Sequence, residues 1–115
     1  MKYYEDVKYM QEAKAFLRSL DSKARLKILY NISKAQYIKD VELFKKLDED
    51  IWEFRTLYNR TYYRLLAFWD SASETVIVCT HGFIKKSGKT PLSELEHAKE
   101  LRKKYYNNNG KVDIT

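Results

Sequence analysis

Four basic side chains lie in segments that are otherwise apolar or aromatic. Arg55 ends the alternating segment IWEFR, Arg64 lies inside TYYRLLAFW, and Lys85 and Lys86 follow TVIVCTHGFI. A charge in such a strand requires a partner or an open, hydrated surface, because burial without compensation is costly. We expect neighbouring strands to bring these four residues into one cationic patch.

Arg64 has two interpretations, because a charged residue in a strand can serve structure or function. In the structural interpretation it forms a salt bridge, for instance to Glu53 or Glu74. In the functional interpretation it lines an open groove with the other basic residues. Basic groups interleaved with aromatic rings suit single-stranded RNA, since charge holds phosphates and rings stack on bases. The expected RNA-contacting residues are Tyr58, Arg60, Tyr62, Phe83, Lys89 and Thr90.

A cationic patch of this kind can support RNA cleavage by the RNA's own 2′-hydroxyl group without a metal. Arginine and lysine stabilise the negative charge that develops on the phosphate. The proton transfers require another group, either a lysine whose pKa is lowered by neighbouring cations or a histidine. His81 is the only histidine in the expected sheet, and a structural role is the commoner one for such a residue. The two histidines and one cysteine match no standard metal-site spacing, so no metal is expected.

An α+β fold is expected to position these residues. Residues 1–40 would form a helical hairpin, with a first helix over 5–20 and a second capped by Asp21 or Ser22. Residues 43–87 would form a three- to four-stranded antiparallel sheet, with turns at 59–60 and 70–73 and the third strand at its centre. Thr90 would cap a final helix over 90–106, with Pro91 at its first position, and 107–115 would form a tail.

The composition suits one domain with one core. The chain has 115 residues, 44% of them hydrophobic, and a formal net charge of +6. The positive charge favours an anionic partner, such as nucleic acid or an acidic protein. Cys79 is interpreted as a small buried hydrophobe, because the chain holds no second cysteine. No secretory signal or membrane-spanning run is recognisable, so a cytoplasmic protein without membrane contact is expected.

Four segments, in this order, resemble the RelE-like toxins, and in particular the HigB branch related to phage-derived proteins. They are IWEFR, YYRLLAFW, THGFIKKSGKTP and ELEHAKE, between Ile51 and Glu100. The resemblance implies a toxin of a type II toxin–antitoxin pair that cuts mRNA in the ribosomal A site. Cleavage would need no metal or other cofactor and would leave a cyclic phosphate. The implied partners are a HigA-type helix-turn-helix antitoxin, the ribosome and mRNA, with operator DNA contacted only through the antitoxin.

The resemblance also implies roles for single residues. Arg64 matches the strand arginine that stabilises the transition state, and Arg55 matches a basic position that faces it. Lys85 and Lys86 match the basic residues that close the third strand, and His81 matches the family's histidine. Some RelE-like toxins also use a catalytic tyrosine near the chain end. Tyr105 and Tyr106 are the candidates for it here, which leaves the identity of the general base open.

Two other functions are compatible with the same residues. A RelE-like module without catalysis would act only with its antitoxin, in repression of their operon. A general basic RNA-binding protein would bind RNA with an affinity that falls steeply with salt, and would not cut it. Ribosome-dependent cleavage of mRNA separates the toxin from both.

Overall fold

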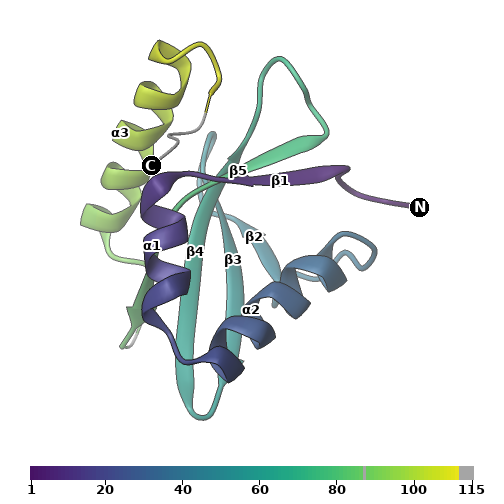
Figure 1. The fold of residues 1–115 in the computed structure, drawn as a ribbon, viewed down its shortest axis with the longest axis vertical. Coiled ribbons are helices and arrows are strands. Elements are labelled where there is room, and N and C mark those ends of the chain that lie inside the picture. The colour runs from purple at the N-terminus through teal and green to yellow at the C-terminus, as the bar shows by residue number, and fades with distance from the viewer. Residues whose placement is uncertain (87, 112–115) are drawn as a thin grey trace.

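A five-stranded sheet lies between two layers of helices in the computed structural model, which describes residues 1–86 and 88–111 (Figure 1). The elements in chain order are β1 (Asp6–Tyr9), α1 (Gln11–Ser19), α2 (Ser22–Ala35), β2 (Phe44–Lys46), β3 (Trp52–Tyr58), β4 (Thr61–Trp69), β5 (Val76–Lys85) and α3 (Leu92–Asn107). The α+β class, the N-terminal pair of helices and the C-terminal helix are therefore confirmed. The predicted tail, 107–115, begins with the last residue of α3, and 112–115 lie outside the described residues.

The strand order is β1-β5-β4-β3-β2, in which β2 to β5 run antiparallel and β1 pairs parallel to β5. The predicted meander over β3, β4 and β5 is confirmed. The prediction of a purely antiparallel sheet with three or four strands is wrong, because β1 adds a parallel fifth strand. The central strand is β4 rather than β5, since β1 covers the outer side of β5.

β1 lies where the sequence predicted the first turns of a helix. Its four residues pair with β5 from Asp6 opposite Val76 to Tyr9 opposite Cys79. Helical periodicity over 5–20 did not separate this short strand from the helix behind it, because its partner lies about 70 residues away along the chain. The helix itself begins only at Gln11, directly after the buried Met10.

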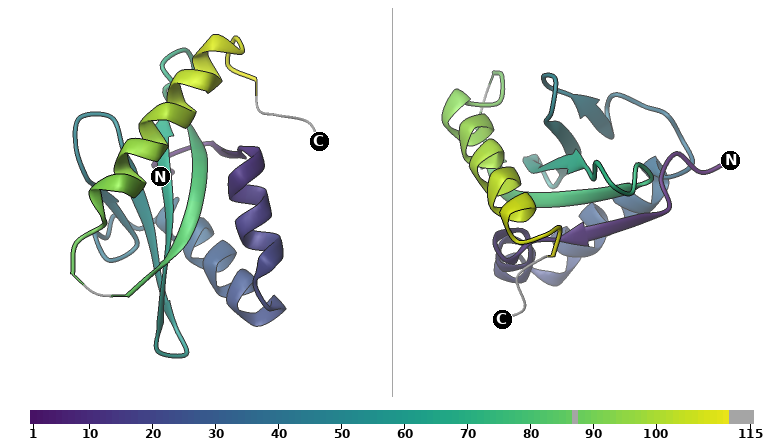
Figure 2. Two further views of the ribbon diagram at one scale, coloured as in Figure 1. Left: turned by 90° about the vertical axis from the view of Figure 1, so that its left-hand side faces the viewer. Right: turned by 90° about the horizontal axis from the view of Figure 1, so that it is seen from above.

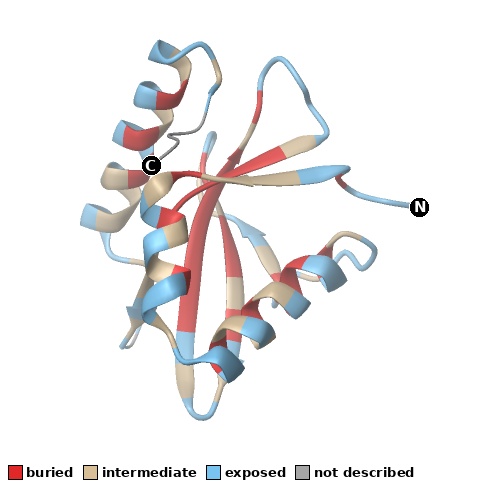
Figure 3. Cartoon of the chain, viewed as in Figure 1, coloured by how far each residue is buried: buried red, intermediate tan, exposed pale blue. Residues whose placement is uncertain are grey.

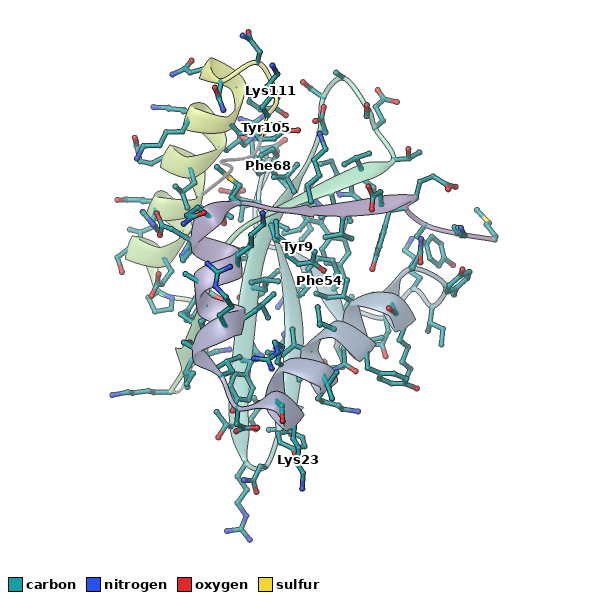
Figure 4. All side chains as sticks on the ribbon, viewed as in Figure 1. Tyr9, Lys23, Phe54, Phe68, Tyr105 and Lys111 are labelled. Atoms are coloured by element: carbon teal, nitrogen blue, oxygen red, sulfur yellow. The ribbon has the colours of Figure 1, made fainter. Side chains whose placement is uncertain are left out.

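The two helical layers cover opposite faces of the sheet, as the edge-on views show (Figure 2). On one face α1 and α2 pack on a core that includes Leu17, Ile28 and Phe54. On the other, α3 packs on a second core, where Phe68 and Tyr105 lie side by side (Figure 4). Because both faces are covered, β4 is buried over most of its length (Figure 3).

Two local features that the sequence predicted set the geometry of the sheet and its helices. Asn59 and Arg60 both have positive φ angles, 49° and 63°, as a two-residue hairpin of type I′ requires. This turn fixes the register of β3 against β4. Asp21 caps α2 by accepting a hydrogen bond from the backbone N–H of Ala24 at 2.9 Å.

The start of α3 differs from the prediction. Its first residue is Leu92, Pro91 occupies the cap position, and no side chain caps the helix. Thr90 instead donates its hydroxyl hydrogen bond to Glu53 on β3. The predicted cap at Thr90 is wrong because a buried carboxylate from a distant strand competes for the same hydroxyl. Across the described part of the chain, no helix combines the length and the apolar character that spanning a membrane requires.

Candidate functional site

Arg55 and Arg64 are direct register partners on β3 and β4, and Glu53 lies beside both. The Nε atom of Arg64 is 3.4 Å from Glu53 Oε1, and that of Arg55 is 3.6 Å from the same oxygen. Glu53 and Arg64 are nearly inaccessible, with side chains 2% and 3% exposed. The salt bridge of the structural interpretation of Arg64 is therefore present, with Glu53 as the partner. One carboxylate therefore holds two guanidinium groups that would otherwise repel each other.

Backbone carbonyls hold the other ends of the two arginines. Arg64 Nη1 donates to the Tyr63 carbonyl at 3.1 Å, and Arg55 Nη1 donates to the Val41 carbonyl at 3.2 Å. The Nε atoms of both arginines are buried and lie within ion-pair distance of Glu53, but neither makes a hydrogen bond in the structure. The guanidinium groups therefore retain hydrogen-bonding capacity.

Lys85 approaches this pair from the end of β5, where it lies opposite Tyr62 of β4. Its pKa is lowered from the ordinary lysine value, first by partial burial and then by the charge of Arg64, while Glu53 acts in the opposite direction. Burial also lowers the pKa of Arg64. A lysine of this kind loses its proton more easily than a solvated lysine, which is the direction that favours a role in proton transfer.

Two adjoining hollows, of about 440 and 390 Å3, share Arg55, Lys85 and Gly88 and together form one depression, here called the basic cleft. Its charged and polar lining consists of Lys45, Lys46, Glu53, Arg55, Tyr62, Arg64, Lys85, Lys86, Lys89 and Thr90. This lining contains seven cationic side chains and the single carboxylate of Glu53. Its excess of positive charge is complementary to a polyanion that offers several phosphates.

Most of the predicted site residues come together in the basic cleft. Arg55, Tyr62, Arg64, Lys85 and Lys86 line one hollow, and Lys89 and Thr90 line the other. Phe83, a further predicted RNA-contacting residue, lies opposite Arg64 on β5, but it is half-buried against the core beneath α3 and lines neither hollow.

Three more predicted residues also lie outside the basic cleft. Tyr58 packs against the core beneath α1 and α2, so the expectation that it lies beside the cationic patch is wrong. The alternation along β3 already indicated this, because Tyr58 shares the parity of Phe54 and not that of Arg55. Arg60 lies in the β3–β4 turn and His81 beneath α3, and neither lines the basic cleft.

His81 is held inside the protein by both ring nitrogens. Its Nδ1 lies 3.1 Å from the Thr80 hydroxyl and its Nε2 lies 3.0 Å from Glu94 Oε1 at the start of α3. The pKa of His81 is lowered mainly by burial; the bond to Glu94 opposes this effect and the charge of His97 adds to it. The neutral ring is therefore favoured, and it joins β5 to α3 rather than facing the cleft.

Tyr105 and Tyr106, the two tyrosines near the C-terminus, also form hydrogen bonds that hold the fold together. The Tyr105 hydroxyl is buried, donates to Asp70 Oδ2 at 2.5 Å and accepts from Lys8 Nζ at 3.2 Å. Burial and the bond to Asp70 raise its pKa. Tyr106 accepts from the Ser71 N–H at 3.1 Å. Neither tyrosine lines the basic cleft.

Sequence reasoning missed three members of the cleft. Lys45 and Lys46 reach it because β2 pairs with β3, which sets Lys45 directly opposite Glu53. The adjacent lysines in FKK were the available signal, but a strand of three residues has too little pattern to be recognised. Glu53 was considered only as a salt-bridge partner, although it organises the site. Within the described residues, no group of three or more histidine, cysteine, aspartate or glutamate side chains is arranged to hold a metal ion.

Comparison with known proteins gives two kinds of match. Residues 15–103 match the model of a family described as "Phage derived protein Gp49-like". Among solved structures, the chain is similar to a toxin RelE variant from E. coli with two arginines replaced by alanine, in the free state. The identity is 18%, the TM-score 0.57, and the match covers 89% of this chain and 98% of that one.

A second solved structure is the RelBE2 toxin–antitoxin complex from Mycobacterium tuberculosis. Its matching chain is 17% identical with a TM-score of 0.55, and the match covers 74% of this chain and all of that one. At these identities the two structures establish that the chain has a RelE-like fold. No curated protein matches the sequence.

Proposed function

The chain belongs to the family of phage-derived proteins similar to Gp49, and on this premise we propose that it is the toxin of a toxin–antitoxin pair that cuts mRNA on the ribosome. The proposal is supported by the RelE-like fold and by the names of its structural neighbours, a toxin and a toxin–antitoxin complex. The observation that carries it is the pairing of Arg55 with Arg64 at the base of a cleft rich in lysine.

In the proposed reaction, the 2′-oxygen of one nucleotide attacks the adjacent phosphorus, and the bond from phosphorus to the 5′-oxygen of the next nucleotide breaks. The products are a 2′,3′-cyclic phosphate and a 5′-hydroxyl end, so atoms balance without a water or a metal. Negative charge develops on the non-bridging oxygens as the phosphorus becomes five-coordinate. Arg55 and Arg64 stabilise that charge from fixed positions, since Glu53 and two carbonyls hold them before RNA arrives.

Proton transfer is assigned to Lys85. The direction of its pKa shift favours release of the ammonium proton, so in this proposal the amine accepts the 2′-hydroxyl proton and the ammonium returns it to the leaving 5′-oxygen. Lys45, Lys46, Lys86 and Lys89 hold flanking phosphates, and Tyr62 offers a half-exposed ring for a base. His81 and Tyr105 are assigned structural roles, because the hydrogen bond of His81 joins β5 to the start of α3 and that of Tyr105 joins the end of α3 to Asp70 after β4.

The proposed partners follow from this role. A HigA-type helix-turn-helix antitoxin would neutralise the toxin and carry any contact with operator DNA. The ribosome would present mRNA to the cleft, which gives the protein a cytoplasmic site of action. A basic protein is suited to this target, since phosphate contacts steer association with RNA.

The decisive experiment is induced expression in a bacterial host followed by primer extension on an abundant mRNA. The chain is expressed in its native form, as Arg64→Ala, and as Arg102→Ala. Arg102 is the matched control, because it is a partly buried arginine on α3 that pairs with Asp50 at 3.7 Å, outside the cleft. We expect new mRNA ends within translated codons for the native chain and Arg102→Ala, and none for Arg64→Ala.

Circular dichroism and urea unfolding of the purified variants establish that each is folded. Cleavage by a folded Arg64→Ala variant at the native rate would remove Arg64 from the mechanism. A folded native chain that neither slows growth nor produces new ends would instead favour the module without catalysis. One observation is compatible with that alternative, namely that Arg64 is almost fully buried against Glu53.

A further inference from the structure

A separate hollow, of about 330 Å3, lies on the face of the sheet opposite the basic cleft, between the end of α2 and β2 at the edge of the sheet. It is here called the aromatic groove, and its main lining residues are Ile38, Val41, Phe44, Lys46, Trp52 and Trp69. Phe44 stacks on Trp52 with ring centroids 4.8 Å apart, and Trp52 meets Trp69 edge-on at 6.0 Å. The aromatic rings thus support one another and form a preformed floor.

The apolar rim of the groove is open to solvent. Val41 is 63% exposed and Ile38 is 48% exposed, although both are strongly apolar. Both follow α2 on the segment that leads into β2, where they lie next to the aromatic floor. A contiguous apolar surface of this kind costs free energy in water and is typical of an interaction site.

The charged groups at the groove indicate the chemistry of its occupant. Lys39 and Lys46 line it and are exposed, and in the described part of the chain neither has a carboxylate within ion-pair distance. Asp40, the one acid in the lining, already accepts a hydrogen bond from the Glu42 N–H. A second copy of this chain would bring another net charge of +6 against the first, whereas an acidic segment would be attracted.

The aromatic groove and the basic cleft lie on opposite faces of the sheet and share one lining residue, Lys46 of β2. This strand lies at the edge of the sheet with only one strand partner, β3. A free sheet edge accepts an extended peptide, whose alternate side chains point to opposite faces. A peptide along β2 would therefore place apolar side chains in the groove and acidic ones toward the lysines of the cleft.

We propose that the aromatic groove binds an extended segment of a partner protein in which apolar and acidic residues alternate, and that this segment reaches over β2 to Lys46 at the margin of the basic cleft. The binding goes beyond the proposed RNA cleavage and does not depend on it. It is measured without RNA or ribosomes, so failure of one proposal is distinguishable from failure of the other.

The chain offers a direct readout, because its two tryptophans, Trp52 and Trp69, both line the groove. The probe is a short synthetic peptide that alternates leucine with glutamate, titrated into the full chain while tryptophan emission is followed. Two further peptides replace either glutamate by lysine or leucine by serine. We expect saturable change in emission with the first peptide only, weakened by added salt.

Val41→Ser tests the location of binding, with Leu26→Ser as its matched control. Both residues are 63% exposed, but Leu26 lies on α2 and outside the groove. We expect Val41→Ser to lower the affinity for the peptide about tenfold, since burying a valine is worth roughly 1.5 kcal/mol. Leu26→Ser should leave this affinity unchanged. Lys39→Gln should reduce the salt dependence of binding, and Lys23→Gln, at the far end of α2 (Figure 4), should not.

Three results would overturn the proposal. One is that the tryptophan emission of the folded chain does not change when the leucine–glutamate peptide is added. Another is equal binding of the leucine–lysine peptide, which would remove the argument from charge. The third is a concentration-dependent dimer in sedimentation that Val41→Ser dissociates, which would make a second copy of this chain the occupant.

Discussion

Arg55 and Arg64 lie directly opposite each other on β3 and β4, and both reach one oxygen of Glu53, at 3.6 and 3.4 Å. Two cations held this close repel each other, so the carboxylate between them is a structural requirement of the pair. The same arrangement fixes both guanidinium groups at the lining of the basic cleft. Measurements on variants can test the charge of Glu53, the pKa of Lys85 and the hydrogen bonds of Tyr105 and His81.

Replacing Glu53 by glutamine keeps the shape of the side chain and removes its charge. We expect Glu53→Gln to lower the free energy of unfolding by about 3 kcal/mol, because the buried Arg64 and the partly buried Arg55 both lose this counter-charge. Urea unfolding measures this change. Glu42→Gln is the matched control, since Glu42 also pairs with Arg55 but is 78% exposed, and its loss should cost less than about 1 kcal/mol. Equal effects of the two variants would mean that Glu53 does not organise the pair.

The pKa of the Lys85 amine is lowered by its partial burial and by Arg64. Removing Arg64 removes a neighbouring positive charge, so the pKa of Lys85 should rise toward the ordinary lysine value in Arg64→Ala. The measurement is an NMR titration of the Lys85 Cε signal, assigned by comparison with Lys85→Arg. A Lys85 pKa that is the same with and without Arg64 would show that the two groups are not electrically coupled.

Tyr105 tests whether a C-terminal tyrosine acts in catalysis or in folding. Tyr105→Phe leaves Asp70 and Lys8 without the hydroxyl between them, so we expect a loss of about 1–2 kcal/mol in the free energy of unfolding. Toxicity of the folded variant at low temperature should equal that of the native chain. Tyr106→Phe, which removes a hydroxyl from an exposed contact with Ser71, should cost less. Loss of toxicity with unchanged stability would return Tyr105 to the catalytic site.

His81 makes stability depend on pH in a definite direction. Its pKa in the folded chain is lowered below the unfolded value near 6.5, so the unfolded chain binds the proton more readily. The stabilising contribution of His81 is complete above about pH 6.5 and is lost as pH falls toward the lowered pKa. Urea unfolding between about pH 7.5 and 5.5 should show a smaller loss for His81→Gln than for the native chain. An identical pH dependence would place the titrating group elsewhere.

Local patterns were sufficient for the parts of the site that lie on one hairpin. Alternation placed Arg55 on the polar face of β3 and Arg64 on the corresponding face of β4, and the two-residue turn at Asn59 and Arg60 set them opposite each other. The same alternation, continued to the end of β3, puts Tyr58 on the face of Phe54 and so excludes it from the face that carries Arg55. The alternation did not indicate that Glu53 would be buried, because burial of that face depends on which elements pack above it.

What the sequence alone determined is the set of strands β3 to β5, their meander, the paired helices, and a cationic face carrying Arg55, Arg64 and Lys85. These follow from periodicity, turn residues and caps, which act over a few neighbouring positions. The tertiary structure alone decided the strand identity of β1, the pairing of β2 that brings Lys45 opposite Glu53, and the bond from Thr90 to that carboxylate. Each of these contacts joins segments that are distant in the chain, and its free energy comes from packing and charge in the folded protein, which no local pattern records.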